Sequence, residues 1–312
     1  MDIKSTILIT GAGGLLGHGL KKALAKRQDC DYKVLSPSSS ELNLLDESAV
    51  LDFFEKNRPD YIFHLAAMVF GLKGNLDNQL LSLSTNVLIN RNVMIACARF
   101  GVKKVFFAGT VAEYGYPYKS LPLQEEHLLK GPPHWGEYGY AMAKREALSY
   151  LEILQKLYDI PYTYGLLTNL YGPHDRFNTE NGHVIPSLLI KAMDASKNKS
   201  QLRVWGRPET TRDFMFSEDA GEAILHAFEK IEGIVNIASG VETSMQVLVE
   251  TIQSNFSGIS GIEWQQDQPV GIPRRSIDIS KLRNSGFATR YSLEDGIRAT
   301  AAWLEHTQDI RK

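Results

Sequence analysis

The chain has few of the residues that build disulfide frameworks, metal centres or membrane spans. It contains only two cysteines, Cys30 and Cys97, whose separation matches no metal-binding spacing and supports no disulfide framework. Cys97 lies in an apolar helical stretch, so we expect a buried and unreactive thiol there. No run of roughly 18 or more apolar residues occurs, which argues against a transmembrane helix.

An excess of charge of either sign is also missing. Lysine and arginine number 34, aspartate and glutamate number 36, and the formal net charge is −2. Such a balance attracts neither nucleic acid nor a membrane surface, so local groups must hold any anionic ligand. The first residues, Met1-Asp-Ile-Lys-Ser, show neither the basic region nor the apolar segment of a signal peptide. We therefore expect a cytoplasmic protein that binds neither nucleic acid nor membranes.

The first half of the chain alternates short apolar strands with helices. We predict strands at 7–10, 34–35, 61–66, 105–109 and 162–167, and helices at 15–26, 49–57, 86–100 and 138–157. The strands are apolar throughout rather than at alternate positions, which is typical of parallel strands covered on both faces. The pattern predicts an α/β fold with a doubly wound parallel sheet (Rossmann), whose ligand crevice lies at the carboxyl ends of the strands.

The pattern loosens after about residue 169, where polar loops separate the elements. Here we predict helices at 186–195 and 220–229 and strands near 202–205 and 233–238. Two lobes follow from this change. Residues 1–169 with about 212–240 form a dinucleotide-binding domain, and about 170–211 with 241–312 form a smaller α/β lobe that binds the substrate.

A glycine motif joins the first strand to the first helix. It reads Thr10-Gly11-Ala-Gly-Gly14-Leu-Leu-Gly17. A turn of this kind needs a residue that tolerates positive φ, and a diphosphate can approach closely only where no Cβ intervenes. The N–H groups at the start of the helix then face the anion. The motif predicts that the chain binds a dinucleotide.

The end of the second strand bears on which dinucleotide is bound. An acidic residue there is typical of NAD sites, because it bonds the ribose 2′-hydroxyl. The segment Ser36-Pro-Ser-Ser-Ser40 has no carboxylate, and its serine hydroxyls suit a 2′-phosphate, although no arginine accompanies them. We therefore favour NADP(H) over NAD(H). Asp46, farther along, either accepts from the adenine amino group or acts as an acid at a helix N-terminus.

Tyr140 and Lys144 are four residues apart in a predicted helix, so they lie on one helical face. A nearby ammonium group favours the phenolate, and we expect it to lower the pKa of Tyr140 toward neutral pH. Such a phenol can act as a general acid or base. Thr110, at the end of the fourth strand, places a hydroxyl where it can share the same carbonyl oxygen. The three residues predict hydride transfer between a nicotinamide and a carbonyl or alcohol.

These motifs together resemble those of the extended short-chain dehydrogenases/reductases that act on nucleotide sugars, and most closely those of the GDP-L-fucose synthases. The resemblance covers nearly the whole chain. It rests on the glycine motif, on Thr110 with Tyr114-Gly115, on Tyr140-x-x-x-Lys144, and on five more specific segments: Glu41-Leu-Asn-Leu-Leu-Asp46, Asn169-Leu-Tyr-Gly-Pro-His-Asp175, His183-Val-Ile-Pro186, Val204-Trp-Gly206 and Pro273-Arg-Arg275.

The resemblance implies inversion of C3 and C5 of GDP-4-keto-6-deoxy-mannose, followed by reduction of C4 with NADPH. The family inverts these centres with a histidine, matched by His183, and a cysteine, whose position is occupied by Ala112. Alanine cannot transfer a proton, and the adjacent Glu113 would point elsewhere from a strand or turn. We therefore expect a C4 reductase. His183 keeps its catalytic position in the family pattern, and without the cysteine it binds substrate or is structural.

Three alternatives stay open. They are a bifunctional epimerase/reductase, a nucleotide-sugar 4-epimerase with bound NAD, and a non-catalytic dinucleotide sensor. A dehydratase is disfavoured, because Val111-Ala112 stands where dehydratases of the superfamily carry Asp-Glu.

We expect catalytic roles for Thr110, Tyr140, Lys144 and His183. The expected cofactor contacts are Gly11, Gly14, Leu15, Leu16, Gly17, Ser36, Asp46, Leu65, Ala66, Ala67, Lys144, Leu167, Asn169 and Leu170. The resemblance implies contacts with a GDP-linked nucleotide sugar at Asn169, His183, Val184, Lys191, Trp205, Arg212 and Arg275. A diphosphate needs such cations in a chain of slightly negative charge. We expect no metal, and the resemblance implies a homodimer that pairs through helices 86–100 and 138–157.

Overall fold

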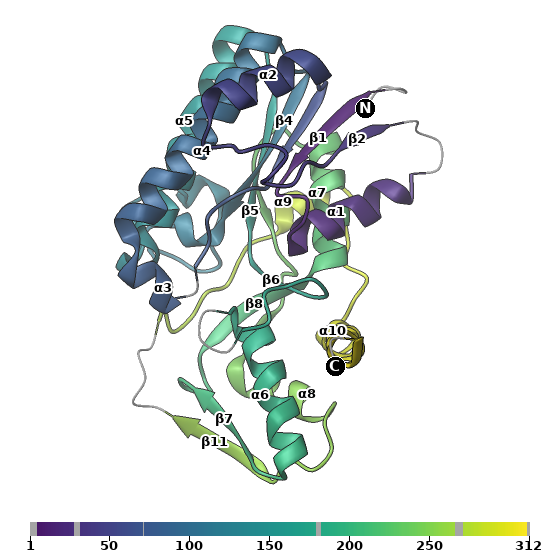
Figure 1. Ribbon diagram of the computed structural model, residues 1–312. Helices are drawn as coiled ribbons and strands as arrows, with labels where there is room; N and C mark the ends of the chain where they lie inside the picture. Colours follow the sequence, from purple (N-terminus) through teal and green to yellow (C-terminus); the bar gives the residue numbers. More distant parts are fainter. Residues whose placement is uncertain (1–4, 28–31, 71, 179–181, 266–270, 311–312) are drawn as a thin grey trace.

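The computed structural model describes residues 5–27, 32–70, 72–178, 182–265 and 271–310. Figure 1 shows two lobes, the larger built on an extended sheet and the smaller lying below it. Cys30 falls outside the described residues.

The larger lobe contains a six-stranded parallel sheet with the order β2-β1-β3-β4-β5-β9. Its strands are β1 (Thr6–Thr10), β2 (Lys33–Leu35), β3 (Tyr61–His64), β4 (Lys104–Thr110), β5 (Tyr162–Leu167) and β9 (Gly233–Ile237). The predicted doubly wound sheet is confirmed. Its connection reverses direction between β1 and β3, which is where such folds open a crevice for ligands.

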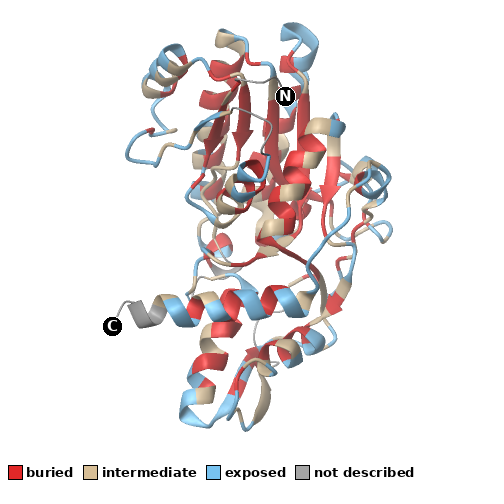
Figure 2. Cartoon of the chain, turned by 90° about the vertical axis from the view of Figure 1, so that its right-hand side faces the viewer, coloured by how far each residue is buried: buried red, intermediate tan, exposed pale blue. Residues whose placement is uncertain are grey.

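Helices cover both faces of this sheet. One face carries α1 (Leu15–Ala25) and α7 (Ser217–Lys230), and the other carries α2 (Glu47–Asn57), α4 (Gln79–Phe100) and α5 (Tyr138–Tyr158). On β1, Ile7 and Ile9 pack toward α1 and α7, whereas Leu8 packs toward the opposite face. Figure 2 shows the buried strands between the two helical layers. Burial on both faces explains why these strands are apolar at every position.

The helix α4 begins earlier than predicted, at Gln79 rather than at residue 86, and follows the short helix α3 (Leu72–Asp77). In this first part Leu80 and Leu81 are exposed and Ser82 is buried, so it carries no apolar stripe toward the core. The amide of Asn86 accepts a hydrogen bond from the Met68 N–H at 2.8 Å and donates to the Met68 carbonyl at 2.9 Å. The asparagine thus holds the segment after β3 against α4.

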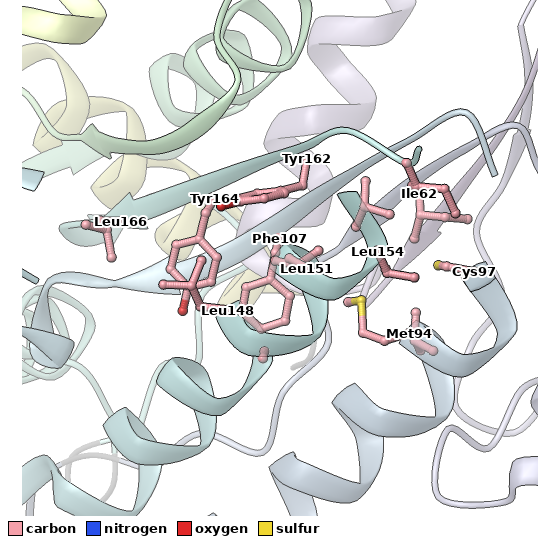
Figure 3. Packing of buried hydrophobic residues seen from close by; sticks show 14 of the residues in the cluster. Ile62, Met94, Cys97, Phe107, Leu148, Leu151, Leu154, Tyr162, Tyr164 and Leu166 are labelled. Atoms are coloured by element: carbon pink, nitrogen blue, oxygen red, sulfur yellow. The ribbon is translucent and has the colours of Figure 1, made fainter. Parts of the chain in front are cut away.

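The core between the sheet and α4–α5 is shown in Figure 3. Cys97 lies there with Met94 of α4, opposite Ile62 of β3 and Leu154 of α5. Its side chain is fully buried, and burial raises the pKa of the thiol. The expectation of a buried thiol at this position is confirmed.

The smaller lobe combines two small sheets with three helices. A three-stranded sheet has the order β10-β8-β6, and β11 pairs with β7. The strands are β6 (Asn169–Tyr171), β7 (Gln201–Trp205), β8 (Thr211–Phe216), β10 (Glu242–Ser244) and β11 (Gly261–Gln265), and the helices are α6 (Val184–Asn198), α8 (Met245–Gln253) and α10 (Leu293–Ile310). A separate apolar core joins them, while α9 (Ser280–Asn284) packs on the larger lobe through Leu282.

The segment 212–240 passes between the two lobes. Its α7 and β9 belong to the larger lobe, whereas β8 pairs with β6 and β10 of the smaller one. Within the described ranges, none of the helices combines the length and apolar character needed to cross a membrane.

The contact between α1 and α7 can be tested through Gly19. A Cβ added to Gly19 would lie 2.1 Å from the Ser217 carbonyl oxygen, whereas one added to Gly13 would meet no atom within 4 Å. We expect Gly19→Ala to lower the free energy of unfolding by about 1–3 kcal/mol, because the two backbones must separate. The control, Gly13→Ala, should change it by about 0.5 kcal/mol or less. Urea unfolding measures both, and equal stabilities would contradict this close packing.

Candidate active site

The turn between β1 and α1 has the shape that a diphosphate requires. Gly11 has φ 70°, and a Cβ there would lie 2.8 Å from the backbone nitrogen of Ala66. A Cβ on Gly17 would lie 2.5 Å from the Cα of Ala12. In the described turn, Gly14 provides no side-chain cap, and the first turn of α1 carries no acidic residue. The N–H groups at the start of α1 therefore fit an anionic dinucleotide.

A polar network that the sequence analysis did not predict crosses the carboxyl ends of β1 and β3. The Thr10 hydroxyl lies 2.7 Å from Nδ1 of His64, whose Nε2 lies 3.2 Å from Oδ1 of Asn90. Asn90 in turn donates to the Ala143 carbonyl in α5 at 3.1 Å. Burial, with a smaller contribution from Lys144, lowers the pKa of His64 to about 3, so the ring is neutral. The sequence feature that could have predicted this network is His64, a polar residue at the end of an otherwise apolar strand.

Tyr140 and Lys144 lie together on α5 as predicted. The Lys144 Nζ atom is 5.6 Å from the centre of the Tyr140 ring and 4.7 Å from that of Phe107. Lys144 is almost fully buried, and burial lowers its pKa to about 8, although the Glu113 carboxylate acts in the opposite direction.

The expected lowering of the Tyr140 pKa is wrong for this structure. Desolvation by the surrounding protein, reinforced by the carboxylates of Glu113 and Glu137, raises the pKa of the phenol instead. These effects outweigh the attraction of the phenolate to Lys144. A protonated phenol is the form that can donate a proton to a developing alkoxide.

Thr110 ends β4 and caps the short helix η1 (Val111–Glu113). Its Oγ1 accepts a hydrogen bond from the Ala112 N–H at 3.2 Å, which leaves the hydroxyl proton available to another acceptor. The Glu113 carboxyl group accepts from the Thr110 N–H at 2.7 Å and turns into the protein. Ala112 is buried beside them.

His183 stands just before α6, with its side chain half exposed. Its Nδ1 lies 3.3 Å from Oδ1 of Asp175, a buried carboxyl group whose Oδ2 has no hydrogen-bond partner in the described structure. Asp175 thereby orients the imidazole. A cavity of about 570 Å³ lies between residues 68–70 and 74–78 on one side and residues 176–178 on the other, and the latter directly follow Asp175. Its walls are formed by Met68, Val69, Phe70, Gly74, Asp77, Asn78, Arg176, Phe177 and Asn178.

The predicted substrate cations are placed in two different ways. Lys191 lies over the exposed ring of Trp205, with Nζ 4.7 Å from its centre. Arg212 is largely buried on β8, where burial and the neighbouring Arg275 lower its pKa to about 10. Neither Lys191 nor Arg212 forms an ion pair with a carboxylate in the described part of the chain.

Arg275, by contrast, is paired inside the protein. Its Nε donates to the Tyr118 hydroxyl and its Nη2 donates to the Glu137 carboxylate, each at 2.7 Å. Burial disfavours the charge, but Glu137 and Tyr118 overcome that effect and raise the pKa of Arg275. Glu137 belongs to η3 (Trp135–Glu137), which immediately precedes α5. The bond therefore ties the chain after β11 to the helix that carries Tyr140.

The loop after β2 also carries the Glu41 carboxylate, directly after the serine run. Glu41 folds back, and its Oε2 accepts from the Ser38 N–H at 2.7 Å and from the Ser38 hydroxyl at 2.8 Å. These hydrogen bonds lower the pKa of Glu41. Asp46 caps α2 by accepting from the Ala49 N–H at 3.2 Å, which is the role of a helix N-terminal acid.

The other predicted contacts lie on several elements of both lobes. Asn169 donates to the Asp213 carbonyl at 2.9 Å and so joins β6 to β8. The remaining residues open α1, follow β2 or β3, end β5, or lie in β6 or at the start of α6: Leu15, Leu16, Ser36, Leu65, Ala66, Ala67, Leu167, Leu170 and Val184. In the described residues, no group of three or more His, Cys, Asp or Glu side chains could hold a metal ion.

The two adjacent arginines provide a matched test of the bond between η3 and the chain after β11. Arg274 pairs with Glu242 at the exposed surface, whereas Arg275 is buried. We expect Arg275→Gln to lower the free energy of unfolding by about 3 kcal/mol, because it leaves the Glu137 carboxylate without its buried partner. Arg274→Gln should cost about 1 kcal/mol or less. Urea unfolding compares them, and equal losses would contradict the role given to Arg275.

Comparisons with known proteins agree with this geometry. The model of the NAD dependent epimerase/dehydratase family matches residues 7–258. The GDP-L-fucose synthase of Escherichia coli K12 is 30% identical over 98% of both chains, and the GDP-L-colitose synthase of Yersinia pseudotuberculosis is 29% identical over 96% of this chain and 97% of its own. A GDP-L-fucose synthetase structure from Naegleria fowleri bound to NADP has a TM-score of 0.89 at 28% identity and covers 100% of this chain and 98% of that one. The chain belongs to the NAD dependent epimerase/dehydratase family.

Proposed function

We propose that this chain is an NADPH-dependent oxidoreductase that reduces the C4 keto group of a GDP-4-keto-6-deoxy sugar. The observation that carries the proposal is the grouping of Thr110, Tyr140 and Lys144 at the carboxyl ends of the strands that also present the glycine turn. The relatives named for GDP-L-fucose and GDP-L-colitose synthesis support a GDP-linked sugar as substrate. A dinucleotide sensor would not require the complete set of reductase residues.

The reduction uses the chain's residues as proton donor and as electrostatic support. When bound, NADPH supplies the hydride that reaches C4. Tyr140 donates its phenolic proton to the carbonyl oxygen. The ammonium group of Lys144 stabilises the phenolate that remains, and the Thr110 hydroxyl donates to the same oxygen. The high pKa of the Tyr140 phenol keeps it protonated before the transfer.

Inversion of C3 and C5 is not part of the proposed activity. Ala112 occupies the position at which the resemblance requires a cysteine, and a methyl group cannot move a proton. The His183–Asp175 pair is retained, and we assign it to binding of the sugar. A 4-epimerase with bound NAD would use the same tyrosine and lysine, but the full-length relatives do not favour it.

The preference for NADP(H) over NAD(H) belongs to the proposal. Its support is the run of serines after β2 and the NADP-bound relative. Ser38 is bonded to Glu41, and the Ser40 hydroxyl oxygen lies 2.9 Å from that of Ser38, so the hydroxyl of Ser36 is the group we assign to the 2′-phosphate. A homodimer is proposed from the exposed leucines Leu81 and Leu88 on α4 and the exposed Ile153 and Leu157 on α5. The cytoplasmic location stays a prediction from the sequence.

The proposed reaction can be tested with GDP-4-keto-6-deoxy-mannose and NADPH in heavy water. We expect the enzyme to oxidise NADPH and to form a product without deuterium at C3 or C5, because no cysteine is available for inversion. NADH in a parallel assay should give a lower kcat/KM. Deuterium at either carbon, above a control without enzyme, would show that inversion survives. Absence of NADPH oxidation would remove the proposed function.

The role of Tyr140 can be tested by removing its hydroxyl. We expect Tyr140→Phe to lower turnover by roughly 10²–10⁴-fold, the usual contribution of a positioned general acid. NADPH binding, followed by fluorescence, should be retained because the ring and Lys144 remain. Tyr138→Phe, two residues earlier on α5, is the matched control and should keep its activity. Near-normal turnover of Tyr140→Phe would assign proton donation to another group.

A further inference from the structure

Glu113 carries a fully buried carboxyl group that the reduction described above does not use. Its two oxygens contact different elements. Oε1 accepts from the Thr110 N–H at the end of β4, and Oε2 lies 2.7 Å from the hydroxyl oxygen of Tyr164 on β5. Tyr164 lies between β5 and α5, as Figure 3 shows. The carboxyl group therefore connects the threonine of the site to the sheet and to the helix of Tyr140.

The hydrogen bonds around Tyr164 indicate that Glu113 carries a proton. The Tyr164 hydroxyl oxygen is 2.7 Å from Glu113 Oε2 and also 2.7 Å from the Lys144 carbonyl oxygen. A phenol has a single proton for these two contacts. Both are satisfied when the protonated carboxyl group of Glu113 donates to Tyr164 and Tyr164 donates to Lys144. Burial raises the pKa of Glu113 to about 7, against the lowering effects of the Thr110 N–H, of the contact with Tyr164 and of the nearby cations.

The charges that face Glu113 come chiefly from α5. Lys144 and Arg145 both attract a carboxylate at this position, and Arg145 also donates to the Glu113 carbonyl oxygen at 2.8 Å. The Tyr140 phenol on the same helix and the phenols of Tyr114 and Tyr164 lie within its field. A negative charge on Glu113 raises the pKa of Tyr140 and of Lys144. Both groups must hold their protons for the reduction.

We propose that Glu113 is a positioning residue: it fixes Thr110 at the end of β4 and, through its charge, sets the pH above which Tyr140 and Lys144 stop supporting reduction. This inference rests on the proposed reductase function. As the pH rises through neutrality, Glu113 loses its proton first. The new carboxylate then delays deprotonation of Lys144 and Tyr140, and activity extends to higher pH.

Glu113→Gln separates the charge from the hydrogen bonds. The glutamine carbonyl can accept from the Thr110 N–H, and its amide can donate to Tyr164, as the protonated glutamic acid does. Because this side chain never ionises, we expect the alkaline limb of kcat/KM to move to lower pH by about one unit. Glu113→Ala removes the support of Thr110 as well, so it should lose more turnover than the glutamine variant at about pH 6.

Tyr164→Phe is the matched control, because it removes the hydroxyl group and keeps the carboxyl group. We expect the alkaline limb of kcat/KM in Tyr164→Phe not to move to lower pH as it does in Glu113→Gln. An equal shift of the limb to lower pH in both variants would mean that disturbed packing, rather than the charge of Glu113, causes the shift. That result would overturn the proposal. If Glu113→Ala fails to fold, the comparison of Glu113→Gln with Tyr164→Phe still tests whether the charge of Glu113 sets the position of the alkaline limb.

A titration of Lys144 tests the inference without turnover. NMR of protein labelled with ¹³C-lysine follows the Lys144 side chain, whose signal is identified by its absence from Lys144→Met. We expect a midpoint lower by about one unit in Glu113→Gln, since removal of a negative charge favours the neutral amine. An unchanged midpoint together with an unchanged pH profile would overturn the role of Glu113. Failure of the wild type to oxidise NADPH would instead remove the proposed function and leave this measurement standing.

Discussion

The burial of the Lys144 ammonium group is the constraint around which the site is built. A cation taken out of water needs compensation, or it loses its proton. Here the compensation comes from the rings of Phe107 and Tyr140 and from the carboxyl group of Glu113. His64, close enough to be influenced by the same cation, is kept neutral and bonded to Thr10 and Asn90. Exclusion of water, with smaller contributions from the neighbouring charges, thus governs which groups of the site can ionise.

The same constraint explains why the phenol is held in its protonated form. A tyrosine beside a lysine would have a lowered pKa if both were in water, but Tyr140 is desolvated and faces two carboxyl groups. For reduction of a ketone this is favourable, because the proton must be present when the hydride arrives. The Tyr140 phenol therefore loses its proton only in the step in which an alkoxide forms and accepts that proton.

The two lobes are joined by an ion pair as well as by the continuous chain. Arg275 reaches from the segment after β11 to Glu137, directly before the helix that carries Tyr140. Lys191 and Arg212 lie in the smaller lobe, and burial lowers the pKa of both; we propose that they bind the diphosphate. The buried Arg275 thus differs from Lys191 and Arg212, which have no carboxylate partner in the described residues, although the sequence predicted all three as substrate contacts.

Local signals in the sequence determined much of this protein. Continuous apolar strands predicted a parallel sheet, the glycines after β1 predicted the turn, and the four-residue spacing of Tyr140 and Lys144 placed them on one helical face. Each of these signals depends on backbone geometry that repeats within a few residues. Family resemblance added the substrate class and drew attention to Ala112.

Only the tertiary structure decided the contacts that tune the site. Glu113 meets Tyr164 across 51 residues, Asn90 meets Ala143 across 53, and Arg275 meets Glu137 across 138. No periodicity encodes such pairs, because they arise when strands and helices distant in the chain are packed together. The direction of the Tyr140 pKa shift was beyond the sequence for the same reason: it depends on how completely other parts of the chain exclude water from one hydroxyl group.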